Sequence, residues 1–180
     1  MIKISNIIKG QQVIISVNSN QKSVTNTHTF CIFTMLKQIK MQLNKETIIA
    51  NANAVCKNTL METLQIEVVD YGDDFLVARM PVNSRVHQPD GVLHGGATAA
   101  LAESVGSFAS HIFIDTENFF VRGIEITANH LKSVKEGFVY AKATFLHKGK
   151  TTQLLDIRVT DEANNLISVC KLSTISLPKK

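Results

Sequence analysis

A glutamate, a glutamine and two adjacent glycines lie close together in the middle of the chain. Glu103 can attack a carbonyl carbon itself or take a proton from an attacking water molecule. Gly95 and Gly96 follow His94 at the predicted start of a helix, where unshielded N–H groups and the helix dipole favour a developing negative charge. Gln88 can supply an amide donor from the preceding loop. Together these residue types suit polarising a carbonyl group and attacking it.

The spacing around Glu103 predicts a helix over Gly96–Phe113 with two distinct faces. One face is a stripe expected to pack on a sheet, made of Leu101, Val105, Phe108 and Ile112. The other is a lane of mostly small residues, made of Gly96, Ala100, Glu103 and Ser107. Because a helix rises 1.5 Å per residue, Glu103 stands on the order of 10 Å from the helix start. If the glutamate and the N-terminal donors act on one substrate, a second subunit is the natural source of one of them.

Taken singly, each of these residues has an ordinary structural explanation. A glutamate in a helix is most often solvated, and a histidine before a helix is often a cap. A Gly-Gly pair at that place is frequently only a tight turn. The segment contains neither a GxGxxG fingerprint nor a P-loop lysine, so phosphate cradling is not indicated. Only the combination points to chemistry.

Six β-prone runs flank the long helix. A short helix is predicted over Ala50–Leu64, and a loop over Asn83–Val92. Gly72-Asp73-Asp74 predicts a hairpin between the first two strands. The predicted strands are Ile66–Tyr71, Phe75–Pro81, Phe120–Leu131, Phe138–His147, Thr152–Thr160 and Leu166–Leu177, of which the last three should form an antiparallel meander. One central helix among six strands favours the α+β class, with one antiparallel sheet around the helix.

The composition is that of a globular chain. Of 180 residues, 44% are hydrophobic and 19% charged, which suffices for a sizeable core. No run of about 18 apolar residues predicts a transmembrane helix. The cysteines, Cys31, Cys56 and Cys170, form no CxxC pair. We therefore expect no disulfide scaffold and no metal site, and a reducing compartment.

The basic charge is confined to one end of the chain. Residues 1–50 hold six lysines against a single acid, Glu46, whereas residues 51–180 hold 13 basic and 14 acidic residues. The formal charge of +4 therefore belongs to the N-terminal part. No cluster of Lys and Arg with interleaved aromatic residues marks a nucleic-acid groove in the remainder.

Residues 1–45 differ from the rest in composition. They lack the apolar region of a signal peptide. Two β-prone runs, Val13–Val17 and Phe30–Phe33, lack turn signals and a regular partner. We expect a poorly specified extension over 1–45, either disordered or upstream of a natural start at Met35 or Met41, and one domain over 46–180.

The string HQPDGVLHGGATAALAESVGS closely resembles the active-site segment of the hotdog-fold acyl-CoA thioesterases. The similarity runs from about Cys56 to Leu177, nearest to the 1,4-dihydroxy-2-naphthoyl-CoA, 4-hydroxybenzoyl-CoA and phenylacetyl-CoA hydrolases. It implies a hotdog fold, with a sheet of about six strands wrapped around one long helix. It also implies a cytoplasmic enzyme without a metal or other cofactor, coenzyme A being part of the substrate. Such enzymes form active sites between two subunits, and their dimers often pair into tetramers.

The resemblance also implies a role for individual residues. Glu103 would attack the thioester carbonyl or activate water, while Gln88 and the Gly95 N–H polarise the carbonyl oxygen. His94 corresponds to a histidine beside them, and Ser107 to a hydroxyl that helps place water or substrate. Contacts to substrate or coenzyme A map onto Gly123, His130, Leu131, Lys132, Ser133, His147, Lys148, Gly149, Lys150, Thr151 and Thr152.

The chemistry agrees with this resemblance, although two of these contacts have structural alternatives. A thioester lacks much ester resonance, so a carboxylate and a positioned oxyanion donor can suffice for its hydrolysis. Lys148 and Lys150 at a glycine turn suit the phosphates of coenzyme A, but also fit an ordinary basic hairpin. His130 shares its strand face with apolar residues, and so also fits a satisfied core histidine.

The sequence therefore predicts an acyl-CoA thioesterase acting on an aromatic or hydroxy-aromatic acyl group, in its most specific form a 1,4-dihydroxy-2-naphthoyl-CoA hydrolase of menaquinone biosynthesis. Three alternatives remain open at this point. They are a broad-range or medium-chain acyl-CoA thioesterase, a hydratase or dehydratase on the same fold, and a non-catalytic acyl-CoA-binding protein. Nucleophilic and general-base roles of Glu103 remain equally open.

Overall fold

The computed structural model describes residues 2–8, 11–17, 45–114 and 118–179, in two compact units, Met1–Leu43 and Asn44–Lys180. In the first unit, β1 (Ile2–Ile8) pairs antiparallel with β2 (Gln11–Val17), with Ile4 opposite Ile15. The prediction that Val13–Val17 has no regular partner is therefore wrong. Both strands are rich in β-branched residues, and the intervening Lys9-Gly10 contains a turn-favouring glycine that the prediction passed over. Phe30–Phe33, Met35 and Met41 lie outside the described residues.

The second unit begins with two short helices instead of the single one predicted over Ala50–Leu64. The first spans residues 45–54, and α2 (Leu60–Thr63) follows after a break. Asn58 adopts a left-handed φ of 59°, which a helix cannot continue through. The Thr59 hydroxyl then accepts from the Met61 N–H at 3.2 Å, and Glu62 Oε2 accepts from the Asn58 N–H at 2.7 Å. These contacts cap the start of α2, after the first helix has ended at residue 54.

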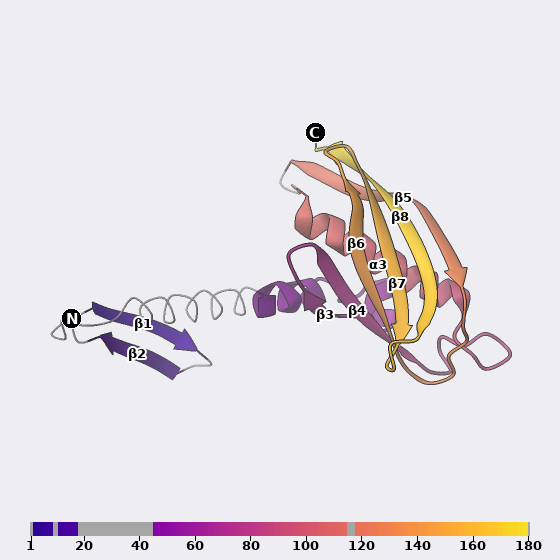
Figure 1. Ribbon diagram of the computed structural model, residues 1–180, viewed down its shortest axis with the longest axis horizontal. Helices are drawn as coiled ribbons and strands as arrows, with labels where there is room; N and C mark the ends of the chain where they lie inside the picture. The colour runs from indigo at the N-terminus through magenta and orange to yellow at the C-terminus, as the bar shows by residue number, and fades with distance from the viewer. Residues whose placement is uncertain (1, 9–10, 18–44, 115–117, 180) are drawn as a thin grey trace. The chain divides into compact units, whose positions relative to one another are not determined.

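Six antiparallel strands form one sheet, in the spatial order β3-β4-β6-β7-β8-β5 (Figure 1). This confirms the predicted α+β class and the meander of the last three strands. The Gly72 N–H donates to the Phe75 carbonyl at 3.0 Å and closes the predicted hairpin. The strands are β3 (Glu67–Tyr71), β4 (Phe75–Val82), β5 (Phe119–His130), β6 (Gly137–Lys148), β7 (Thr152–Asp161) and β8 (Leu166–Pro178).

One long helix, α3 (Gly95–Phe113), lies against a face of this sheet (Figure 1). Its fully buried residues include Leu101, Ala102, Val105 and Ala109. Phe108 and Ile112, expected in the packed stripe, are only partly buried. Small residues form much of the contact because helix and sheet approach closely: a Cβ at Gly106 would stand 2.6 Å from Leu172 Cδ2. Glu103 lies on another, exposed side of the helix, next to the edge strand β5, and the two-faced pattern predicts this exposure.

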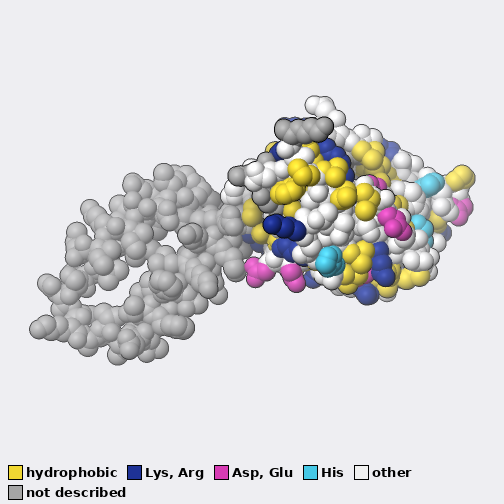
Figure 2. Space-filling model, turned by 90° about the horizontal axis from the view of Figure 1, so that it is seen from above, with side chains coloured by type: hydrophobic (Ala, Val, Ile, Leu, Met, Phe, Trp, Pro, Cys, Tyr) yellow, Lys and Arg dark blue, Asp and Glu magenta, His cyan; other side chains and the backbone are white. Residues whose placement is uncertain are grey.

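Strand β5 is an edge of the sheet, and most of its side chains are exposed. Its pairing with β8 shifts register between Gly123 and Glu125, so Ile124 occupies an irregularity and is 58% exposed. Phe120 and, on β8, Leu177 are also large exposed hydrophobic residues. Figure 2 views the molecule from the side on which the chain ends, and hydrophobic side chains there gather beside lysines and arginines. Among the described residues, no helix has both the length and the apolar character that crossing a membrane requires.

Candidate active site

The loop before α3 is held by backbone hydrogen bonds that set the position of Gln88. The Gln88 N–H donates to the Val92 carbonyl at 2.9 Å, and the turn between them uses Gly91 with a φ of 77°. Leu93 is tied to the following loop, since its N–H donates to the Val134 carbonyl at 2.8 Å. The predicted loop Asn83–Val92 is thus ordered by its own pairing, and it delivers Gln88 to the start of α3.

His94 is the N-cap of α3. Its Nδ1 accepts a hydrogen bond from the Gly96 N–H at 2.8 Å, and its carbonyl accepts from the Ala97 and Thr98 N–H groups at 3.0 and 3.1 Å. An Nδ1 that accepts places the proton of a neutral imidazole on Nε2. Of the first-turn donors, the Gly95 N–H is the one without a partner among the described residues. A ligand oxygen can therefore bind at Gly95 without displacing a protein group.

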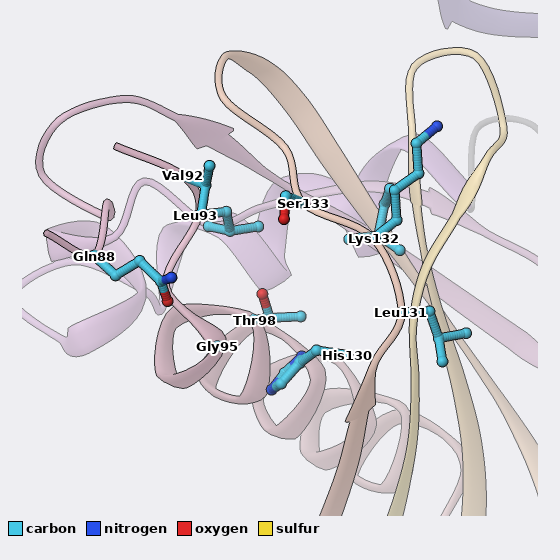
Figure 3. Close-up of a pocket in the computed structure, with 10 residues that line it drawn as sticks. Gln88, Val92, Leu93, Gly95, Thr98, His130, Leu131, Lys132 and Ser133 are labelled. Carbon is cyan, nitrogen blue, oxygen red and sulfur yellow. The ribbon is translucent and has the colours of Figure 1, made fainter. Parts of the chain in front are cut away.

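Gln88 and Gly95 line a cavity of about 270 Å³ (Figure 3). In Figure 3 the amide of Gln88 extends toward the start of α3, and His130 reaches the same helix turn from the end of β5. A Cβ at Gly95 would stand 2.7 Å from His130 Nε2, so only glycine lets this imidazole lie against the helix. The remaining lining residues are Val92, Leu93, Thr98, Leu131, Lys132, Ser133 and Ile167.

Glu103 lies outside this cavity, although on the same helix. It is exposed, and a Cβ on Gly123 of β5 would come within 3.4 Å of its Oε1. The carboxylate therefore lies over a position of the edge strand that carries no side chain. Ser107, one turn further on, is half-buried on the same side of the helix. Within one chain, the Glu103 carboxylate is therefore separate from the donors at Gly95 and Gln88. This agrees with the separation expected along the helix.

Apart from Gly123, which lies on β5 beside Glu103, the predicted contacts to substrate or coenzyme A fall into two places. Four of them, His130–Ser133, line the cavity at Gly95, where Lys132 Nζ also lies 3.9 Å from Asp161 Oδ2. The others form the turn between β6 and β7, in which the Gly149 N–H donates to the Thr152 carbonyl at 3.1 Å. A Cβ at Gly149 would stand 2.6 Å from the Thr152 carbonyl oxygen, a backbone atom, so the turn requires glycine.

The turn between β6 and β7 borders a second cavity, of about 430 Å³, between itself and the end of α3. The Lys148 ammonium lies 4.8 Å from the centre of the Phe113 ring and 5.4 Å from that of Phe145, a cation–π arrangement. Lys150 is exposed, and both it and Lys148 line the cavity. The remaining lining residues are Phe113, Ile114, Phe119 and Gly149.

Several residues at these cavities carry no signal in the sequence. Thr98 looks like any helix residue, yet it is buried and lines the cavity at Gly95. Ser168 is fully buried beneath His130, with its Oγ 3.2 Å from Nδ1. Gln153 is buried beneath the turn between β6 and β7 and donates from Nε2 to the Gly149 carbonyl at 2.8 Å. Strand alternation gives the face of such a residue but not its hydrogen-bond partner.

Comparison with known proteins decides the family. The model of the thioesterase superfamily matches residues 90–168. The Pseudomonas aeruginosa protein PA1618 is 41% identical over 126 residues, covering 70% of this chain and 87% of the relative. The proofreading thioesterase EntH of Cronobacter turicensis is 43% identical over 122 residues, covering 68% and 88%. The chain belongs to the thioesterase superfamily. It is a thioester hydrolase with the hotdog fold, as the sequence motif predicts.

Solved thioesterase structures match the arrangement described above. The crystal structure of a mutant of the thioesterase PA1618 from P. aeruginosa superposes with a TM-score of 0.72 at 39% identity, covering 73% of this chain and 94% of that one. The thioesterase HI1161 of Haemophilus influenzae superposes with a TM-score of 0.70 at 39% identity, covering 72% and 90%. The residues that the family model matches, 90–168, include the helix with Glu103, and Gln88 lies two residues before them.

Proposed function

We propose that this thioesterase hydrolyses aromatic or hydroxy-aromatic acyl-CoA thioesters, with 1,4-dihydroxy-2-naphthoyl-CoA of menaquinone biosynthesis as its specific substrate. The observation that carries the proposal is the small cavity lined by Gly95, the Gln88 amide and the His130 imidazole, in which the Gly95 N–H has no partner among the described residues. At about 270 Å³ it lies just below the usual range of about 300–1,000 Å³ for ligand pockets. A compact acyl group fits within this volume, whereas a long chain would extend beyond the part of the site that one chain forms.

The reaction follows from the charges and donors at this cavity. The thioester carbonyl oxygen accepts from the Gly95 N–H and the Gln88 amide, which stabilise the negative charge of the tetrahedral intermediate. In the general-base route Glu103 takes a proton from water as the water oxygen bonds to the carbonyl carbon. In the nucleophilic route the carboxylate forms that bond and gives an anhydride that water then cleaves. In both routes the C–S bond breaks, the acyl group leaves as the free acid, and the departing thiolate takes up a proton of the water consumed and becomes the thiol of coenzyme A.

Both routes require Glu103 from one subunit and the donors from another. Strand β5 is exposed at the sheet edge, and the Glu103 carboxylate lies over its Gly123. A second copy paired along β5 would cover Ile124, and would bring Glu103 of one copy near the cavity of the other. The protein is therefore proposed to act as a homodimer with shared active sites, and its dimers to pair into a homotetramer.

The turn between β6 and β7 is proposed to hold the phosphate end of coenzyme A. Lys148 and Lys150 bring two positive charges to the rim of the cavity of about 430 Å³. Phosphate oxygens accept charge-assisted hydrogen bonds from such groups. Gly123 and the segment His130–Ser133 would contact the part of the substrate nearer the thioester. The proposed chemistry needs no metal or other cofactor, because the carboxylate and the two donors supply it, and we place the enzyme in the cytoplasm.

The test is the release of free thiol from a panel of aromatic, hydroxy-aromatic and medium-chain acyl-CoA thioesters. Turnover should be highest with the aromatic members, with 1,4-dihydroxy-2-naphthoyl-CoA among the best, and should be lost in Glu103→Ala. Preference for a medium-chain substrate would contradict the proposed substrate class. Thermal stabilisation by the thioesters without thiol release would indicate a binding protein instead, and hydration of an unsaturated acyl chain a hydratase.

A further inference from the structure

His130 reaches the cavity from the end of the edge strand β5, and its Nε2 lies against Gly95 (Figure 3). Whether this imidazole offers the cavity a hydrogen-bond donor or an acceptor depends on which ring nitrogen carries the proton. The partner of the other nitrogen decides that. In this protein the partner is Ser168 of β8, whose Oγ lies 3.2 Å from His130 Nδ1.

The hydrogen bonds of Ser168 fix the direction of this contact. Ser168 is fully buried, and its hydroxyl has a single proton. The hydroxyl donates to the carbonyl of Asn129 at 3.0 Å, and a carbonyl can only accept. With its proton so used, Ser168 Oγ can bond to His130 only by accepting, so that Nδ1 carries the imidazole proton.

A second neighbour is consistent with this assignment. Cys170 Sγ lies 3.4 Å from Ser168 Oγ, and burial raises the pKa of the Cys170 thiol. The thiol therefore remains protonated and can donate to the second lone pair of the serine oxygen. In this arrangement all three polar groups around Ser168 are satisfied, as buried polar groups are expected to be.

We propose that Ser168 is a positioning residue that holds His130 in the neutral Nδ1–H tautomer, with the lone pair of Nε2 facing the cavity beside Gly95. This rests on the proposed function only in assigning the cavity to the acyl group. In this tautomer His130 accepts a hydrogen bond from a hydroxyl on the bound acyl group. The opposite tautomer would present a second donor beside the Gly95 N–H, and would not accept from such a hydroxyl.

The direct test is a long-range proton–nitrogen NMR spectrum of the full chain labelled with ¹⁵N-histidine, with the His130 signals assigned from His130→Gln. It is recorded at about pH 8, above the ordinary histidine pKa of about 6.5. The expected spectrum has a protonated Nδ1 and an unprotonated Nε2. In Ser168→Ala the Nε2–H form should become populated, whereas Ser168→Thr should restore the wild-type pattern. A wild-type signal with a protonated Nε2, or an unchanged pattern in Ser168→Ala, overturns the proposal.

Ser173→Ala is the matched control, since Ser173 is a half-buried serine on the same strand, paired with Leu154 and Glu125. It should leave the His130 signals unchanged. A similar shift in this variant would mean that removing any serine hydroxyl from β8 changes the tautomer of His130. That result would overturn the specific role of Ser168.

Kinetics supply a readout that separates this proposal from the proposed function. One lost hydrogen bond should raise the KM of Ser168→Ala for 2-hydroxybenzoyl-CoA, whose hydroxyl is next to the carbonyl group, about tenfold, and leave that for benzoyl-CoA within about twofold. An equal effect on both substrates overturns the proposed positioning role. If the wild-type protein hydrolyses neither thioester but gives the expected spectra, the proposed substrate class fails while the role of Ser168 in setting the tautomer stands.

Discussion

At the first turn of α3, one imidazole determines which backbone donors remain for a ligand. His94 accepts from the Gly96 N–H at 2.8 Å and leaves the N–H of Gly95, a residue that lines the cavity, without a partner among the described residues. The same contact shapes the helix terminus, because a capped first turn holds its neighbouring N–H groups in fixed directions. His94 can therefore support the chemistry of Gly95 without touching the reacting atoms.

Asparagine can replace His94 as a cap, whereas alanine cannot. Loss of the N-cap in His94→Ala should lower the free energy of unfolding by about 1 kcal/mol in urea titrations. His94→Asn should remain within about 0.5 kcal/mol of the wild type and keep its turnover within about threefold. A stable His94→Asn enzyme with turnover lowered a hundredfold or more would mean that the imidazole itself takes part in the reaction.

The proposed hydrolysis depends most on the carboxylate of Glu103. Glu103→Gln preserves the shape of an exposed side chain but removes its ability to attack or to accept a proton. Turnover should fall at least about a hundredfold, while binding of an acyl-CoA ester is retained. Thiol release measures the first quantity and calorimetric titration the second. Turnover close to that of the wild type would remove the carboxylate from the mechanism.

At the scale of single residues, sequence spacing predicted the functional groups that are exposed or line a cavity. It missed the buried polar side chains that hydrogen-bond to these groups or to the turn. Glu103 and Gly95 stand out because small neighbours and a helix start surround them. Ser168 and Gln153 occupy ordinary alternating strand positions. Ser168 bonds to Asn129, 39 residues away, and Gln153 bonds to Thr174 and Ser176 on another strand, and no local pattern specifies such partners.

Beneath the turn between β6 and β7, a chain of buried hydrogen bonds connects four elements. Thr174 Oγ1 donates to Gln153 Oε1 at 2.6 Å and lies 3.3 Å from Ser110 Oγ of α3. Gln153 Nε2 then donates to the Gly149 carbonyl at 2.8 Å and contacts Ser176 Oγ at 3.1 Å. The turn is therefore anchored to the helix and to two strands through one amide.

Gln153→Leu should destabilise the protein, because it leaves Thr174, Ser176 and the Gly149 carbonyl without this partner. The free energy of unfolding should fall by about 1–3 kcal/mol in urea titrations. Arg158→Met, an exposed change on the same strand, is the control, and should stay within about 0.5 kcal/mol of the wild type. Equal stability of Gln153→Leu and the control would contradict a structural role for the buried amide.

The order of the helices and strands after residue 45 could be predicted from the sequence, but one boundary could not be predicted from periodicity. Apolar residues continue at helical spacing from Ala52 to Leu64 although the helix breaks between them. The break was marked by capping chemistry instead, with Thr59 and Glu62 in the spacing of a capping box. Periodicity reports which face is buried, and it does not report whether the backbone is interrupted.

In the molecule as a whole, the position of β5 at the sheet edge is what makes it a surface for pairing with a second subunit. Its place at the sheet edge follows from pairing with β8, a partner more than 30 residues later in the chain, and so could not be predicted from local pattern. The edge leaves Ile124, Phe120 and, on β8, Leu177 exposed to solvent in one chain. A long edge with exposed apolar residues is a surface expected to pair with another strand.

Introducing a charge at this edge should separate the proposed subunits. Ile124→Lys should convert the dimer or tetramer to a monomer in sedimentation velocity experiments, because burying an unpaired ammonium is unfavourable. Turnover should be lost with it. Leu60→Lys, which alters a 60% exposed residue of α2, should change neither property. An Ile124→Lys protein that keeps both its assembly and its turnover would exclude pairing along β5.

The most direct measurement of the shared active site mixes two inactive variants. Glu103→Gln and Gln88→Ala should each lose about a hundredfold or more in thiol release when assayed alone. Unfolded together in equal amounts and refolded, they should form mixed dimers in which one of the two sites carries neither substitution. We predict recovery of about one quarter of wild-type turnover, as random pairing of two subunits requires. Turnover that stays at the level of the separate variants, with mixed dimers shown to form, would mean that the carboxylate and the donors do not meet across a subunit boundary.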